Sequence, residues 1–101
     1  MKKFIVSIDQ GTTSTRSMLF DMSGKQIFVS QKEIKQYFPK IGWVEHDPEE
    51  IWKKTKLTLR ACIKKSVKLK GKILTIGITN QRETTLIWDK VTGKCIYNAI
   101  V

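Results

Sequence analysis

Short apolar runs separated by polar turns open the chain, and they predict strands rather than a helix. Residues 4–8 form a β-branched apolar run typical of a buried strand, and residues 17–21 resume this character after a polar interruption. Residues 22–25 have the composition of a hairpin turn, in which Gly24 adopts a positive φ at little cost. Because residues 26–32 alternate as a third strand would, we expect an antiparallel meander of three strands.

The clearest helix signal begins at Asp47, after an irregular stretch over residues 33–46. Asp47 is a good N-cap, and Pro48 suits the first helical position. Glu50 stands three residues after Asp47, which is the spacing of a capping box. The expected buried face recurs at helical intervals and consists of Trp52, Thr55, Leu59, Cys62 and Ile63. The helix should end near residues 70–71, with its lysines on the opposite side.

A second apolar run over residues 73–79 follows this helix, so it can return parallel to an earlier strand by a right-handed crossover. Residues 80–83 are a polar interruption, and residues 84–88 and 95–101 are expected as two further strands around a turn at residues 89–94. The predicted fold is therefore α/β, a mixed sheet with the element order βββαβββ.

Composition supports one globular domain. The 101 residues are 41% hydrophobic and 28% charged, which excludes a disordered or collagen-like chain. No apolar run reaches the ~20 residues that a membrane-spanning helix needs, and no secretory leader is recognisable at the start, so we expect a cytoplasmic protein with no membrane partner. Cys62, Cys95 and the single histidine, His46, are too few for a structural zinc site, and we expect two reduced thiols.

The charge balance raises a second class of function. The formal net charge is +10, and residues 53–72 contain basic residues but no acid. A basic nucleic-acid-binding module that uses this lysine-rich helix is therefore the alternative hypothesis. Most of the cations are lysines, which bind as hydrated point charges rather than as the forked donors that recognise bases. We favour a solvated helix face and no nucleic-acid partner.

A hydroxyl-rich segment follows the first apolar run. Asp9 ends the run, and Gly11 permits close approach of a ligand to the backbone. Four consecutive hydroxyl residues come next, namely Thr12, Thr13, Ser14 and Thr15. Hydroxyls and backbone N–H groups can hold phosphate oxygens, and Arg16 can neutralise phosphoryl charge. Asp9 would repel bare phosphate, so it suits a site in which Mg²⁺ lies between them. A solvated turn is the alternative, since no Walker A pattern occurs.

The pair Arg82-Glu83 comes directly after the second apolar run, where open α/β sheets present ligand-binding groups. Arginine can donate to the hydroxyls of a small polyol and glutamate can accept from them. A surface ion pair is the alternative. His46 has no partner in the sequence and is expected in a turn. Core or interface roles are expected for the three tryptophans, Trp43, Trp52 and Trp88.

Four segments carry specific motifs in order along the whole chain: residues 7–16, 42–48, 77–84 and 97–101, the last preceded by Gly93. Their sequences are SIDQGTTSTR, GWVEHDP, GITNQRET and YNAIV, and together they resemble the glycerol kinases of the FGGY carbohydrate kinase family. The resemblance implies a ribonuclease-H-like, actin-like ATPase lobe. It also implies the ATP- and Mg²⁺-dependent phosphorylation of glycerol to sn-glycerol 3-phosphate.

The resemblance also implies roles for individual residues. The residues that would contact ATP or ADP are Gly11, Thr12, Thr13, Ser14 and Arg16. Asp9 would hold the metal through water. Glycerol or its phosphate would contact Thr12, Arg82 and Glu83. The turns at Asp9 and Arg82 must then meet on one rim of the sheet.

Glycerol kinases are several times longer than this chain. The resemblance therefore implies that residues 1–101 are the N-terminal portion of the family's N-terminal domain, without the general base or the second lobe. The isolated chain is expected to be inactive, and its apolar end at residues 99–101 could drive self-association. A non-catalytic interaction domain built on the same lobe is a third hypothesis.

Overall fold

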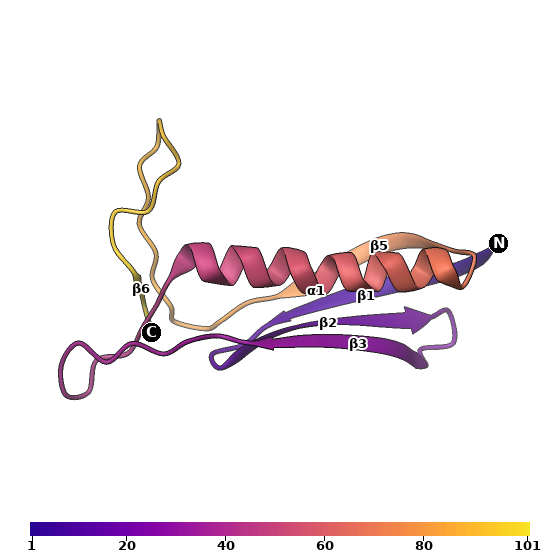
Figure 1. Ribbon diagram of the computed structural model, residues 1–101, viewed down its shortest axis with the longest axis horizontal. Helices are drawn as coiled ribbons and strands as arrows, with labels where there is room; N and C mark the ends of the chain where they lie inside the picture. The colour runs from indigo at the N-terminus through magenta and orange to yellow at the C-terminus, as the bar shows by residue number, and fades with distance from the viewer.

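A mixed four-stranded sheet and one long helix make up most of the computed structural model, which describes residues 1–101 (Figure 1). The strands β1 (Lys2–Gln10), β2 (Ser14–Asp21), β3 (Gln26–Glu33) and β5 (Gly71–Thr79) lie in the order β3-β2-β1-β5. The first three strands are antiparallel neighbours, and β5 is parallel to β1. The predicted meander and the predicted parallel return are both confirmed.

The helix α1 (Pro48–Lys68) crosses one face of this sheet between β3 and β5 (Figure 1). Its start is as predicted, because the Asp47 side chain accepts a hydrogen bond of 3.0 Å from the backbone N–H of Glu49. The capping-box spacing also predicts a bond from the backbone N–H of Asp47 to the Glu50 side chain, and this prediction is wrong. The Glu50 carboxylate accepts instead from the backbone N–H of Lys35 at 2.6 Å, so it fastens the helix to the segment after β3.

The predicted buried face of α1 is confirmed at Cys62, and Thr55 and Leu59 are half-buried, but the rest of the face differs from the prediction. Its buried residues are Thr58, Cys62 and Ser66, whereas Trp52 is 58% and Ile63 43% exposed. Small side chains let the helix approach the sheet closely, and Thr58 hydrogen-bonds across the interface to Ser17 of β2. The apolar core beneath it consists of Phe4, Val6, Ile8, Leu19 and Cys62. Both cysteines are free thiols, as expected.

A second, smaller ladder lies beyond the start of the helix. The short strands β4 (Glu45–His46) and β6 (Ala99–Ile100) pair antiparallel. Tyr37 bridges to Glu45 on one side, and Thr85 bridges to Ile100 on the other. This ladder therefore brings together four segments that are far apart in the sequence.

The two strands predicted after β5 are largely wrong. Residues 84–88 contribute only isolated bridges, and of residues 95–101 only Ala99–Ile100 form a strand. The intervening chain is an arm that extends away from the sheet, drawn in orange to yellow (Figure 1). Its apolar side chains have no sheet to pack on, and Trp88 is 58% exposed. Trp43 is 49% exposed, so the tryptophans do not form the core.

The 21-residue helix α1 lacks the run of apolar residues that crossing a membrane requires.

Candidate functional site

The carboxyl ends of β1 and β5 lie side by side. The two strands are parallel neighbours in which Asp9 pairs with Thr79, and Arg82 comes three residues beyond Thr79. The hydroxyl-rich loop and the loop at residues 80–84 therefore leave the sheet at the same rim, as the sequence predicted. A ligand lying across this rim would reach both loops.

The turn after β1 is tight. The backbone N–H of Gly11 donates to the carbonyl of Ser14 at 3.0 Å, and a Cβ on Gly11 would stand 3.1 Å from that same oxygen. Thr12 and Thr13 are exposed at the tip, whereas Ser14 already belongs to β2, where its hydroxyl accepts from Gln31. The predicted run of hydroxyls is thus divided between a loop and a strand.

The backbone polarity of this loop suits an anion. The Thr12 carbonyl accepts from the Gln36 side chain at 2.8 Å, and the Thr13 carbonyl accepts from the backbone N–H of Ile34 at 2.9 Å. No hydrogen bond within the chain uses the N–H groups of Thr12 and Thr13. The carbonyls are therefore occupied, and the two donors remain available to phosphate oxygens.

Asp9 and Arg16 face each other across β1 and β2. Arg16 Nη2 donates to Asp9 Oδ2 at 2.8 Å, and their side chains are 42% and 35% exposed. The chain brings no three His, Cys, Asp or Glu side chains together as a metal site. Asp9 nevertheless fits Mg²⁺, which commonly binds one or two carboxylates and takes its remaining ligands from water and substrate phosphates.

Sequence reasoning assigned no role to Gln10. Its Oε1 accepts from the Thr15 hydroxyl at 2.7 Å and from the Thr55 hydroxyl at 2.9 Å. One amide oxygen thus joins the end of β1, the start of β2 and the helix. The signal in the sequence is a glutamine placed between two motif residues, Asp9 and Gly11.

Arg82 and Glu83 are exposed at the rim, and they form no ion pair with each other or with any other residue. The alternative of a surface ion pair is therefore wrong. Glu83 has a φ of 58°, in the left-handed region that residues other than glycine seldom adopt. Such strain is often found at binding sites, where the surrounding structure must hold it in place.

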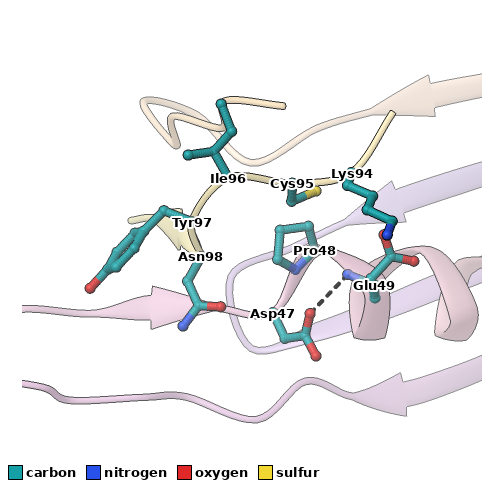
Figure 2. A pocket seen from close by; sticks show the side chains of 8 residues that line it. All are labelled: Asp47, Pro48, Glu49, Lys94, Cys95, Ile96, Tyr97 and Asn98. Atoms are coloured by element: carbon teal, nitrogen blue, oxygen red, sulfur yellow. Dashed lines mark hydrogen bonds between the residues drawn. The ribbon is translucent and has the colours of Figure 1, made fainter. Parts of the chain in front are cut away.

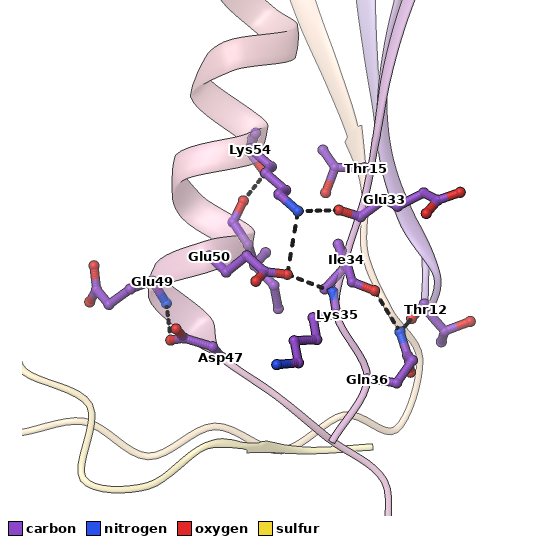
Figure 3. A network of polar contacts seen from close by, with 12 residues as sticks. Thr12, Thr15, Glu33, Ile34, Lys35, Gln36, Asp47, Glu49, Glu50 and Lys54 are labelled. Carbon is purple, nitrogen blue, oxygen red and sulfur yellow. Dashed lines mark hydrogen bonds and ion pairs between the residues drawn. The ribbon is translucent and has the colours of Figure 1, made fainter. Parts of the chain in front are cut away.

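A series of hydrogen bonds, buried at its centre and exposed at its Thr12 end, connects the two loops. Gln36, whose contact with Thr12 is drawn in Figure 3, bonds through its Oε1 to His46 Nε2 at 2.8 Å. His46 Nδ1 in turn lies 3.2 Å from Gln81 Nε2, and Gln81 Oε1 accepts from the Thr84 hydroxyl at 2.9 Å. His46 is fully buried in β4, so its predicted place in a turn is wrong.

A separate hollow of about 650 Å³ lies at the start of α1, between Asp47-Pro48-Glu49 and residues 94–98 of the arm (Figure 2). None of the site residues predicted from the sequence lines it. The loops that meet at the rim, rather than this hollow, carry the candidate chemistry.

Comparison with known proteins identifies the family of this chain. The N-terminal domain of the FGGY family of carbohydrate kinases matches residues 4–101. The chain belongs to this family. It is 57% identical to the glycerol kinase of Alkaliphilus metalliredigens and 52% identical to that of Roseiflexus, over all 101 residues in both cases. It spans 20% of the length of each of these relatives.

Solved structures show the same fold. The crystal structure of Plasmodium falciparum glycerol kinase with ADP superposes with a TM-score of 0.89 at 42% identity, over 99% of this chain and 20% of that one. The crystal structure of gluconate kinase from Lactobacillus acidophilus superposes with a TM-score of 0.87 at 26% identity, over 100% of this chain and 20% of that one. These neighbours are sugar kinases with the actin-like ATPase fold, which confirms the predicted fold class. Nothing in the comparisons supports a nucleic-acid-binding module.

Proposed function

We propose that this chain supplies the phosphate-binding loop and part of the glycerol site of a glycerol kinase. The reaction is the transfer of the γ-phosphoryl group of ATP to a glycerol hydroxyl, which gives sn-glycerol 3-phosphate. The observation that carries the proposal is the meeting of the two loops on one rim, with Asp9 in register with Thr79. The similarity to glycerol kinases supports the choice of substrate.

The loop after β1 would bind the nucleotide phosphates. Gly11 allows the tight turn, and Thr12 and Thr13 offer N–H donors that no group in the chain accepts. Ser14 adds a hydroxyl at the base of the loop, and Arg16 would contact ADP. Asp9 would hold Mg²⁺ through water, and the metal would supply charge neutralisation at the phosphate oxygens. The part of this chain is to orient the phosphates and to complement their charge.

The loop after β5 would bind the polyol. Arg82 donates and Glu83 accepts, and neither side chain is engaged by another residue. Charged groups bind neutral hydroxyls more strongly than neutral groups do, so one such pair can orient a three-carbon alcohol. Thr12, from the neighbouring loop, would contact the hydroxyl that receives the phosphoryl group.

Residues 1–101 would then be the N-terminal portion of the family's N-terminal domain, working in the cytoplasm, where ATP is supplied. All the roles proposed above are binding roles, and none provides a general base for the glycerol hydroxyl. The 101-residue polypeptide assayed alone is therefore expected to show no turnover above a control without enzyme.

A chimeric enzyme tests the proposal. Residues 1–101 would replace the aligned segment of the glycerol kinase of A. metalliredigens, to which they are 57% identical. The chimera should form glycerol 3-phosphate from ATP and glycerol. Arg82→Ala should raise its KM for glycerol by about tenfold or more, since a hydrogen bond from a charged group is lost.

Arg60→Ala is the matched control, because Arg60 is an exposed arginine on α1 away from the rim. It should leave both KM values unchanged. A chimera that phosphorylates gluconate or xylulose in preference to glycerol, or that does not respond to Arg82→Ala, would refute the proposal.

A further inference from the structure

Three buried or half-buried side chains, Gln36, His46 and Gln81, form what we call the amide–imidazole bridge. It joins the Thr12 carbonyl, in the loop after β1, to the Thr84 hydroxyl, in the loop after β5. The four bonds are 2.8, 2.8, 3.2 and 2.9 Å long, so the connection has no gap. The proposed function assigns no binding or catalytic role to these three residues.

The partners determine which nitrogen of His46 carries hydrogen. The Gln36 amide nitrogen donates to two carbonyls, those of Thr12 and Ile34, so its oxygen is the atom that faces the imidazole. An oxygen can only accept, and His46 Nε2 must therefore be the donor. At the other end the Gln81 oxygen accepts from Thr84, which leaves its amide nitrogen to donate to Nδ1. One neutral tautomer satisfies every bond.

Burial makes these bonds costly to lose. His46 is 0% and Gln81 9% exposed, and no buried side-chain nitrogen or oxygen in the chain lacks a partner. If one member is removed, the next is left unpaired without water to replace it. The centre of the bridge, His46 and Gln81, is therefore shielded from water, whereas its end at the Thr12 carbonyl is exposed.

The backbone supports the same geometry. Tyr37, next to Gln36, exchanges two hydrogen bonds of 2.9 and 3.0 Å with Glu45, next to His46. On the other side β4 pairs with β6, and Ile100 exchanges two bonds of 2.9 Å with Thr85, next to Thr84. The contact between Gln36 and His46 thus has a backbone pairing beside it, and β6 connects β4 to the segment that follows Thr84.

The bridge ends on the strained turn of the second loop. Gln81 and Thr84 flank Arg82 and Glu83, and the hydrogen bond between their side chains closes the turn that contains the left-handed Glu83. A non-glycine residue keeps such a conformation only where its surroundings determine it. His46 helps to stabilise the conformation of this turn, because its buried imidazole bonds to the Gln81 side chain.

We infer that the amide–imidazole bridge fixes the phosphate-binding loop and the polyol-binding loop relative to each other, with His46 as its central positioning residue. This inference rests on the proposed function of the two loops. His46 is buried and contacts neither ligand. It acts through the Thr12 carbonyl at one end of the bridge and through the 81–84 turn at the other. A substitution at either end should therefore alter the binding of both ligands.

Reciprocal kinetics in the chimera test this coupling. Gln36→Ala removes a side chain that bonds to the Thr12 and Ile34 carbonyls and to His46 but to no residue of the loop after β5. It should nevertheless raise the KM for glycerol by about 3- to 10-fold, the equivalent of one net hydrogen bond. His46→Leu should raise both KM values. Gln26→Ala is the matched control, since Gln26 is an exposed glutamine at the start of β3 and should change neither constant.

The tautomer gives a second readout that needs no turnover. His46 is the only histidine of the chain, so nitrogen NMR of the ¹⁵N-labelled 101-residue protein reports on it alone. We expect a protonated Nε2 and an unprotonated Nδ1 at neutral pH. Gln36→Ala should weaken this preference without reversing it, because Gln81 still donates to Nδ1, and it should leave circular dichroism unchanged.

The outcomes separate the two ideas. If Arg82→Ala impairs glycerol binding but Gln36→Ala affects only the KM for ATP, the inference is wrong and the proposed function stands. An Nδ1–H tautomer, or an imidazole protonated on both nitrogens at neutral pH, would also overturn the inference. If the chimera ignores Arg82→Ala while the NMR tautomer is as expected, the proposed function fails and the structural bridge remains.

Discussion

Two residues other than glycine adopt left-handed backbone conformations, Lys70 with a φ of 57° and Glu83 with a φ of 58°. Lys70 follows the C-cap residue Leu69 of α1, and its N–H donates to the Val67 carbonyl at 2.9 Å. Glycine is the preferred residue at this position after a helix, because it has no Cβ to clash with the backbone. Lys70→Gly should therefore stabilise the protein.

The magnitude follows from two opposing terms. Left-handed geometry costs an L-residue about 1–2 kcal/mol, whereas the added freedom of glycine in the unfolded chain costs roughly 0.4–1 kcal/mol. The free energy of unfolding should rise by about 0.5–1 kcal/mol, or about 2–8 °C in Tm for a domain of this size. Urea unfolding of the 101-residue protein, followed by circular dichroism, measures the change.

Lys68→Gly is the control two residues earlier. Lys68 is the last residue of α1 and has ordinary helical geometry, so glycine there should lower the stability by about 0.5–1 kcal/mol. The same replacement thus has opposite signs at two neighbouring lysines. Glu83→Gly should stabilise the protein as Lys70→Gly does, but in the chimera it should also raise the KM for glycerol. Equal destabilisation by Lys68→Gly and Lys70→Gly would show that the strain argument is wrong.

Three further predictions concern other parts of the chain. Gly71→Ala would place a Cβ 2.0 Å from a ring carbon of Phe4 and should cost about 1–3 kcal/mol in urea unfolding, whereas Gly77→Ala, with nothing within 4 Å, should be close to neutral. The hydrogen bond to Glu45, together with desolvation and the nearby negative charge, raises the pKa of Tyr97 above its ordinary value of 10.0. The contribution of this phenol to the free energy of unfolding is therefore complete below pH 10, and it is lost as the pH rises through the folded-state pKa. Ultraviolet titration of the phenol should show this upward shift, and Glu45→Gln should reduce it. The 101-residue protein should associate with increasing concentration, because β5 is an edge strand with exposed apolar side chains; sedimentation showing a strict monomer would contradict this.

Local signals predicted the parts of the fold that depend on local chemistry. Asp47 and Pro48 identified the helix start because capping needs only adjacent residues. The parallel return of β5 followed from the length of the preceding helix, and it placed Asp9 and Arg82 on one rim. The residues assigned to ligands therefore came from motifs that are continuous in the sequence.

Features that depend on distant partners were missed. Residues 84–88 have strand-like composition, but composition does not reveal that no long strand lies beside them. His46 bonds to residues 10 and 35 positions away, which no local pattern could indicate. Part of the helix face was missed for a related reason. Thr58 is buried with its hydroxyl bonded to that of Ser17, 41 residues earlier, a partner that no local pattern indicates.

The contact between Asp9 and Arg16 has a consequence for the order in which ligands arrive. In the structure the carboxylate and the guanidinium neutralise each other at 2.8 Å. A phosphate that draws Arg16 to itself leaves Asp9 as an uncompensated anion beside a new negative charge. A divalent cation arriving alone would instead displace the arginine without giving it a counter-charge. Under the proposed function, each event alone leaves one of these two charges without a partner, so we expect the nucleotide and its metal to enter as a single preformed complex.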